Sequence, residues 1–326
     1  MELYGLTSNP VPSNASVGSV LTPDGVTLRY ARWRPTARRQ RGTVCIIQGR
    51  AECIEKYFET IADLRRRGFA VLAFDLRGQG GSERLLGDPR KGHVDDFNEY
   101  VIDLDHIVHS IMLPFMPPPY FALSHSMGSA ALLLALDRGQ SPFERAVVLA
   151  PLTGIVNLAF PNLAKAAATG FDFFALGTSY VPGGSATSLA TRPFARNKLT
   201  SNPARYQRVA DIIAAHQLLG LGDPTIRWTL AMFEAFKRFA DRDFGRRIAV
   251  PTLMILPGAD PLCSTPASEL LAARIRACQM ILVPGAKHEL LTERDVFRQQ
   301  FFAAFDAFIP GESSQDERIS EQASAA

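Results

Sequence analysis

Long apolar runs and strong charge are both missing from this 326-residue sequence. The longest apolar run, 130–136, is much shorter than the roughly 20 residues that span a bilayer, so we expect no transmembrane segment. The net charge of +3, from 35 basic and 32 acidic side chains, is too small and dispersed to indicate a nucleic-acid partner. Peripheral contact with a membrane stays open, and the sequence leaves the oligomeric state unknown.

Cysteine is scarce as well. The four cysteines cannot form the disulfide framework of a small secreted protein, and none has the close Cys/His spacing of a zinc site. With no glycine-rich phosphate loop either, we expect reduced thiols, no metal and no cofactor. Residues 1–16 lack the basic and then apolar pattern of a secretory signal. These absences favour a cytoplasmic location, at most peripheral to the inner face of the membrane.

The sequence does contain short apolar runs that alternate with helical patterns. Expected buried strands cover 42–47, 70–74, 120–123, 145–150, 252–256 and 279–283, and expected helices cover 55–67, a segment from Met127 onward, and 294–308. This alternation predicts an α/β fold with a mostly parallel, doubly wound sheet. Pro23-Asp24-Gly25, between two alternating segments, predicts an antiparallel hairpin at the sheet edge.

The strand rhythm stops after Pro151 and returns at Thr252. We therefore predict a core in two parts with an inserted helical cap. The expected limits are 1–151 and 246–310 for the core, 152–245 for the cap and 311–326 for a polar, disordered tail.

The sharpest chemical signal is Ser124-His125-Ser126-Met127-Gly128, which lies between an expected strand and an apolar helix. A strand that turns abruptly into a helix strains the central residue and exposes its side chain, so the residues two before and two after it must be small. Both are small here. We predict Ser126 as a nucleophile, the alternative being an ordinary serine that starts a helix.

Serine needs a base, and the base needs an anion that orients it. In the α/β-hydrolase fold the chain order is serine, acid, histidine, with the last two on loops after strands. Asp260 follows the strand at 252–256, and His288 follows the strand at 279–283. We predict these two as acid and base. The alternatives are a turn residue for Asp260 and a surface histidine for His288.

An acyl-transfer intermediate also needs two amide donors for its oxyanion. We predict the backbone N–H groups of Met127 and Arg50, the latter in the loop after the strand at 42–47. The Arg50 side chain has three open roles: reaching a phosphate, pairing with Glu52, or covering the loop. His125 is expected to point away from Ser126 with a structural role, although it could line the substrate cavity.

With these residues assigned, the sequence resembles the bacterial lysophospholipase and monoacylglycerol lipase group of α/β hydrolases, also called the serine aminopeptidase S33 or Hydrolase-4 family. The resemblance covers nearly the whole ordered chain. Its carriers are Gln48-Gly49-Arg50, Glu52, Lys56-Tyr57, 74–82 (FDLRGQGGS), 92–97 (GHVDDF), Tyr100 and 222–228 (GDPTIRW). Two residues depart from the usual pattern: Gln48 stands in place of His, and Ser124 in place of Gly. Within the 74–82 block, Arg77 is expected to tie down the loop.

The resemblance implies a serine hydrolase that cleaves carboxylic esters of monoacyl lipids through an acyl-enzyme on Ser126. It also implies acyl-chain binding by the cap, for which Phe160, Phe171, Phe173, Phe174 and Trp228 are suited, although each could simply pack cap to core. The main alternative is a carboxylesterase or thioesterase acting on small substrates. A non-catalytic scaffold is disfavoured because all three triad residues are present.

Overall fold

A single eight-stranded sheet organises the molecule. The computed structural model describes residues 1–156, 158 and 161–310. The strands are β1 (Ser16–Leu21), β2 (Thr27–Trp33), β3 (Thr43–Ile47), β4 (Ala70–Phe74), β5 (Tyr120–His125), β6 (Arg145–Leu149), β7 (Thr252–Pro257) and β8 (Cys278–Val283). Their order across the sheet is β1-β2-β4-β3-β5-β6-β7-β8. Strands β3 to β8 are parallel, while β1 and β2 add an antiparallel pair at one edge, as the sequence predicts.

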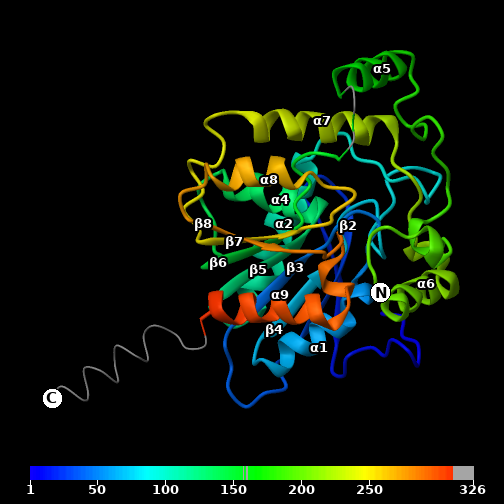
Figure 1. Cartoon of the computed structure of the whole chain (residues 1–326). Coiled ribbons are helices and arrows are strands. Elements are labelled where there is room, and N and C mark those ends of the chain that lie inside the picture. The colour runs from blue at the N-terminus through cyan, green and yellow to red at the C-terminus, as the bar shows by residue number, and fades with distance from the viewer. Residues whose placement is uncertain (157, 159–160, 311–326) are drawn as a thin grey trace.

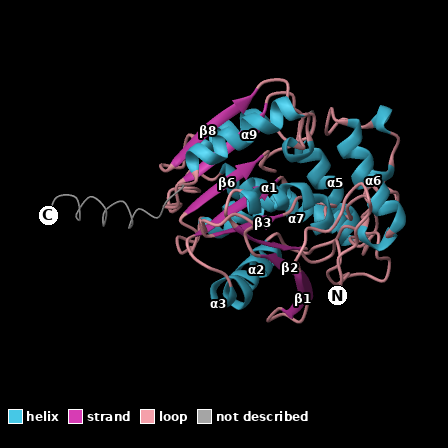
Figure 2. Ribbon diagram, turned by 90° about the horizontal axis from the view of Figure 1, so that it is seen from below, coloured by secondary structure: helices cyan, strands magenta, loops and turns pink. Residues whose placement is uncertain are grey.

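Helices cover both faces of this sheet (Figures 1 and 2). The helices are α1 (Phe58–Arg66), α2 (Asn98–Ile107), α3 (Leu113–Phe115), α4 (Met127–Leu136), α5 (Pro161–Phe173), α6 (Pro203–Ala215), α7 (Ile226–Ala240), α8 (Thr265–Ala272) and α9 (Asp295–Phe308). On one face α1 and α9 pack against the sheet, and on the other face α2, α4 and α8 do so. The α/β class and the mostly parallel, doubly wound sheet predicted from the sequence are confirmed.

Strand alternation explains the two cores. Successive side chains of a strand point to opposite faces, and β3 sends Val44 and Ile46 to the α1–α9 side but Cys45 and Ile47 to the other. All five residues of β3 are buried, as expected for a central strand covered on both sides. No helix in the described part of the chain is both long and apolar enough to cross a membrane.

Between β6 and β7 the described chain forms helices α5, α6 and α7. Helix α7 also contributes to the core, because Trp228 is 5% exposed and lies against Phe97. The limits 152 and 245 for a separate cap therefore remain a prediction. The predicted disordered tail, 311–326, lies outside the described residues.

Candidate active site

The sheet register brings the loops that carry the predicted site residues to one edge. Ile47 pairs with Ser124 across β3 and β5, and His125 pairs with Leu149 across β5 and β6. At the other end of this row, Pro257 pairs with Val283 across β7 and β8. The carboxyl ends of five parallel strands are thus aligned. The turns that follow them meet at the position where open α/β sheets place their sites.

Ser126 occupies a sharp strand-to-helix turn. Its φ of 52° and ψ of −115° lie in a sparsely populated region for a residue with a side chain. Two hydrogen bonds hold it there: its N–H donates to Leu149 O at 3.0 Å, and its carbonyl accepts from Leu152 N–H at 3.1 Å. Strand β6 and the residues after it therefore hold Ser126 in this strained conformation, and its hydroxyl lies at the start of α4.

Ser126, His288 and Asp260 form one hydrogen-bonded series. His288 Nε2 lies 3.0 Å from Ser126 Oγ, and His288 Nδ1 lies 2.7 Å from Asp260 Oδ2. The second carboxylate oxygen, Oδ1, accepts the N–H groups of Leu262 at 2.8 Å and Cys263 at 3.0 Å. The three residues predicted from the sequence thus come together in the geometry that lets a histidine deprotonate a serine.

Electrostatics favour charge separation between His288 and Asp260. Burial disfavours the charged imidazole, but the Cys263 sulfur and the Asp260 carboxylate outweigh it and raise the pKa of His288 to about 9. Burial likewise disfavours the Asp260 carboxylate, yet the hydrogen bonds from His288 and from two backbone amides lower its pKa. An ionised Asp260 is suited to stabilise the imidazolium that forms during reaction.

The two backbone amides predicted to bind an oxyanion belong to neighbouring elements. A Cβ on Gly128 would lie 2.3 Å from Gln48 O and 2.5 Å from Ile47 O, so α4 starts in direct contact with the end of β3. Met127 is the first residue of α4, where N–H groups have no intrahelical acceptor. In the facing loop the N–H of Gly49 donates to Glu52 and that of Ala51 donates to Gln79, and Arg50, the other predicted oxyanion donor, lies between these two residues.

A buried charged network contacts the backbone of His288, and the sequence analysis did not predict it. His125 Nδ1 lies 2.9 Å from Glu52 Oε1, and its Nε2 lies 3.2 Å from the His288 carbonyl oxygen. Lys56 Nζ lies between two carboxylates, 2.7 Å from Glu52 Oε1 and 2.9 Å from Glu289 Oε1. The only sequence signals were the Glu52–Lys56 spacing of four and the position of Glu289 directly after His288.

The contacts of His125 favour its protonated form. Both of its ring nitrogens face acceptors, a carboxylate and a carbonyl, which favours the doubly protonated ring. Burial opposes the charge, but Glu52 outweighs it and raises the pKa of His125. As expected, His125 does not hydrogen bond to Ser126; it bears instead on the backbone of His288.

The two departures from the family pattern have structural partners. Gln48 Nε2 donates to Asp75 Oδ1 at 2.9 Å, while its Oε1 is buried without a partner among the described residues. Ser124 Oγ lies 2.9 Å from Ser129 Oγ on the first turn of α4. The hydroxyl at position 124 is therefore satisfied inside the turn and does not reach the site.

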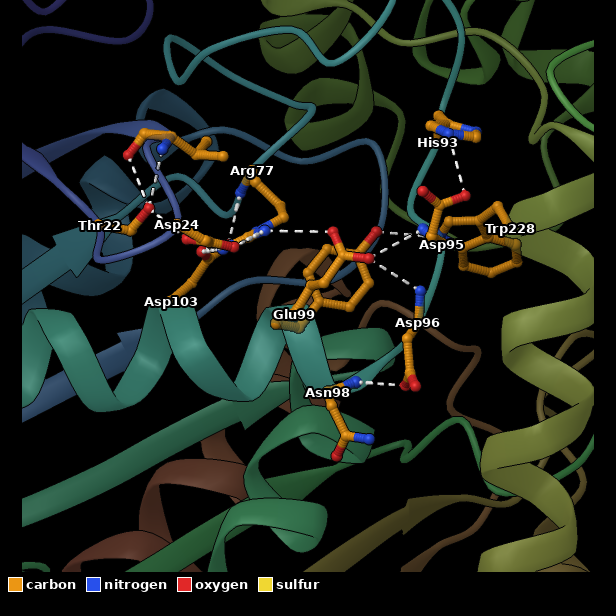
Figure 3. Close-up of polar contacts among 12 residues, drawn as sticks. Thr22, Asp24, Arg77, His93, Asp95, Asp96, Asn98, Glu99, Asp103 and Trp228 are labelled. Atoms are coloured by element: carbon orange, nitrogen blue, oxygen red, sulfur yellow. Dashed lines mark hydrogen bonds and ion pairs between the residues drawn. The ribbon is translucent and has the colours of Figure 1, made fainter.

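Arg77 and the start of α7 brace the loops beside the site (Figure 3). Arg77 Nε donates to Asp103 Oδ1 at 2.8 Å, and its Nη1 donates to Asp24 at 2.6 Å and Glu99 at 3.1 Å. The expectation that Arg77 ties down its loop is met by these bonds. Nearby, Trp228 Nε1 donates to the hydroxyl of Tyr100 at 3.0 Å, which fixes α7 to α2.

The expected acyl-binding phenylalanines of the cap need correction. Phe173 and Phe174 are 83% and 74% exposed at the end of α5, and Phe171 is 40% exposed. They lie on the surface because α5 packs chiefly on α7 (Figure 1), so they do not enclose an acyl chain in this structure. Phe160 lies outside the described residues.

One group in the described chain has the composition of a metal site. Ligand atoms of Asp260, Cys263 and His288 lie within 4.8 Å of one another. The carboxylate and imidazole in this group already hydrogen bond to each other, on the side of His288 that faces away from Ser126. The arrangement therefore serves to orient the histidine and offers no open metal position at the serine.

Comparisons with known proteins identify the family of this chain. A family model described as serine aminopeptidase, S33, a hydrolase family, matches residues 38–295. Lysophospholipase L2 of Escherichia coli strain K12 is 32% identical over 91% of this chain and 88% of its own. A probable lysophospholipase L2 of Haemophilus influenzae is 29% identical over 82% and 84%.

Among solved structures, a soluble variant of the Saccharomyces cerevisiae monoglyceride lipase has the same fold. It superposes with a TM-score of 0.72, covering 94% of this chain and 99% of that chain at 18% identity.

Proposed function

Because the chain belongs to the serine aminopeptidase S33 family of hydrolases, we propose that this serine ester hydrolase cleaves the carboxylic ester of monoacyl lipids, as a lysophospholipase or monoacylglycerol lipase. The observation that carries the proposal is the placement of His288 between Ser126 Oγ, at 3.0 Å, and Asp260 Oδ2, at 2.7 Å. The lipid class is supported by 32% identity to a lysophospholipase L2 over 91% of the chain.

The proposed reaction has two halves. His288 Nε2 takes the proton of Ser126 as the oxygen attacks the ester carbonyl, and the N–H groups of Arg50 and Met127 stabilise the oxyanion. The intermediate then expels the glycerol-side alcohol, which receives the proton from His288. Water next attacks the acyl-enzyme, giving its proton to His288, and the second intermediate releases the fatty acid as the proton returns to Ser126.

A substrate panel tests this assignment. Wild type and Ser126→Ala are compared on a lysophospholipid, a monoacylglycerol with the same acyl chain, and a short p-nitrophenyl ester. We expect wild type to cleave a monoacyl lipid and the variant to lose at least about 1,000-fold in kcat. Cleavage of the short ester alone would replace the lipid assignment by a carboxylesterase. Equal rates for both proteins would remove Ser126 from its role and favour a scaffold without catalysis.

We also propose that the enzyme acts in the cytoplasm and contacts the inner face of the membrane through the surface of α5. All four cysteines are free thiols, which suits a reducing compartment. Leu163 near the start of α5, Phe173 at its end and Phe174 directly after it are 67%, 83% and 74% exposed, and exposed apolar side chains suit insertion at a lipid interface. Co-sedimentation with lipid vesicles should fall several-fold in Phe173→Ser/Phe174→Ser, and unchanged sedimentation would argue against this contact.

A further inference from the structure

A cavity of about 370 Å³ lies beside the triad, between the loop after β3 and the cap segment 190–199. Leu262 and Glu289 border it, and each belongs to a triad loop: the Leu262 N–H donates to Asp260, and Glu289 directly follows His288. The cap segment is fixed to the same loop, because Glu289 N–H donates to Leu199 O at 2.9 Å. The cavity therefore borders the loops that carry Asp260 and His288, and the predicted oxyanion residue Arg50.

The carboxylates that line the cavity are already neutralised. Glu52 and Glu289 both contact Lys56, at 2.7 and 2.9 Å, and Glu52 also contacts His125 at 2.9 Å. Both carboxylates thus have partners inside the protein. Glu52 and Glu289 therefore do not pair with the other charged groups of the cavity, all of which are cationic.

Four further cations line the cavity: Arg50, Arg192, Arg196 and Lys198. We call this part the cationic pocket. Arg192 has only a distant carboxylate partner, Asp223 at 3.8 Å, and within the described chain Arg196 and Lys198 have no ion pair. The backbone between them is ordered by local bonds, since Asn197 Nδ2 donates to Thr200 O at 2.7 Å. The charges are therefore presented from a fixed segment.

Arg50 gives the strongest indication of an absent anion. Its Nη2 donates to Gly222 O at 2.6 Å and its guanidinium lies 5.3 Å from the Trp228 ring centre, but its Nε is buried with no partner among the described residues. Burial lowers the pKa of Arg50 to about 10, against the opposing effects of Tyr100 and Asp223. A buried guanidinium that lacks an anion is costly, and a ligand anion would relieve that cost.

We propose that the cationic pocket binds the headgroup phosphodiester of a lysophospholipid and makes the enzyme prefer such lipids to neutral monoacylglycerols. This inference rests on the proposed function. Arginine and lysine clusters match phosphate oxygens through charge-assisted hydrogen bonds, whereas a glycerol head has no charge to pair with them. In a lysophospholipid the phosphate is only the glycerol backbone away from the scissile ester, which fits a pocket bordered by both triad loops.

The test is a ratio of activities. Arg196→Gln/Lys198→Gln removes two exposed cations of the pocket without touching the triad or Arg50. Lysophosphatidylglycerol and a monoacylglycerol with the same acyl chain are presented in micelles of a neutral detergent. We expect wild type to favour the phospholipid, and the ratio of the two kcat/KM values to fall 10- to 100-fold in the double variant.

A matched control removes the same charge elsewhere. Lys237→Gln/Arg246→Gln alters two exposed cations that do not line the cavity and should leave the ratio within about twofold of wild type. A ratio that stays unchanged in the pocket variant, or falls equally in the control, would overturn the proposal. Cleavage of neither lipid by wild type would instead overturn the proposed function.

Inhibition of short-ester hydrolysis tests the pocket independently of lipid turnover. Glycerophosphoglycerol carries the headgroup phosphodiester, and inorganic phosphate carries the anion alone. We expect glycerophosphoglycerol to inhibit wild type at a concentration at least tenfold lower than inorganic phosphate, and to inhibit the pocket variant at least tenfold more weakly. Equal inhibition by both anions would assign the pocket to free phosphate, and no inhibition by either would overturn anion binding.

Discussion

His288 is placed between two groups that make opposite demands on its protonation. As a base it must be neutral to accept the Ser126 proton at 3.0 Å, whereas the Asp260 carboxylate at 2.7 Å favours the charged ring. Its pKa of about 9 means that the charged form dominates at neutral pH in the free enzyme. The same interaction that stabilises the imidazolium during reaction thus lowers the fraction of enzyme that is ready to react.

This conflict predicts the pH dependence of the enzyme. Because neutral His288 is the active form, kcat/KM on a short ester should rise about tenfold per pH unit and level off near pH 9. Asp260→Asn removes the carboxylate that favours the charged ring, so its residual activity should level off at a lower pH, with kcat reduced about 10,000-fold. Ser126→Ala supplies the background rate. A wild-type limb centred near pH 6.5 would show that the pKa of His288 is not raised in the free enzyme.

At the scale of elements, the contact between the start of α4 and the end of β3 positions the oxyanion amides. Only a residue without a side chain fits at position 128, because the carbonyls of Ile47 and Gln48 occupy the space. These carbonyls belong to a buried strand and the residue after it, and they cannot rotate away. Separation of helix and strand would widen the gap between Met127 and Arg50.

Gly128→Ala should therefore reduce catalysis and also destabilise the fold. Its Cβ would meet Gln48 O at 2.3 Å, so α4 must shift, and we expect a loss of about 100- to 1,000-fold in kcat with a smaller change in KM. The matched control is Gly170→Ala in α5, where a Cβ meets nothing within 4 Å; it should keep full activity. Loss of activity in both variants, or normal activity in Gly128→Ala, would contradict the role of Gly128 in holding α4 against the end of β3.

How far the sequence predicts this site depends on how local each signal is. The turn at Ser126 and the strands before Asp260 and His288 are encoded in short segments. The spacing of apolar residues and the small residues of the turn were therefore sufficient to predict them. The Glu52–His125–Glu289 network was not predictable, because its members come from two loops and the end of β5 and meet only through the sheet order. Exposure of Phe173 and Phe174 was equally hidden, since it depends on how α5 packs on α7.

On the scale of the whole molecule, a cluster of ion pairs joins helix α6 of the cap to helix α1 of the core. Helix α6 lies against α1 through Glu59, whose carboxylate accepts from Arg205 at 2.7 and 2.9 Å and from Arg208 at 2.8 Å. Arg205 also donates to the carbonyl of Glu293 at 2.7 Å, close to the His288 loop. Helix α6 contributes Tyr206 and Val209 to the cavity, so this ion cluster also fixes one wall of the cationic pocket.

The cluster predicts a pH-dependent stability difference between wild type and Glu59→Gln. Burial opposes the charge on Glu59, but Arg205, Arg298 and Arg208 outweigh it and lower the pKa from about 4.5 to about 2. A lowered carboxyl pKa stabilises the fold above the unfolded-state value and loses that effect as pH falls through the folded-state value. Glu59→Gln should therefore cost about 1–2 kcal/mol of unfolding free energy at pH 7, with the difference narrowing only below about pH 4.5.

Urea unfolding at pH 7, 4 and 3 measures this difference, and hydrogen exchange locates it. Amides of α6 should exchange faster in Glu59→Gln, because the helix loses its anchor on α1 while its own hydrogen bonds remain. Glu234→Gln is the matched control: its single ion pair, with Lys165, is solvent-exposed and should contribute less than about 0.5 kcal/mol. Faster exchange in β3 or β5 rather than in α6 would show that Glu59 stabilises the core instead of the cap, and would disconnect this ion cluster from the wall of the cationic pocket.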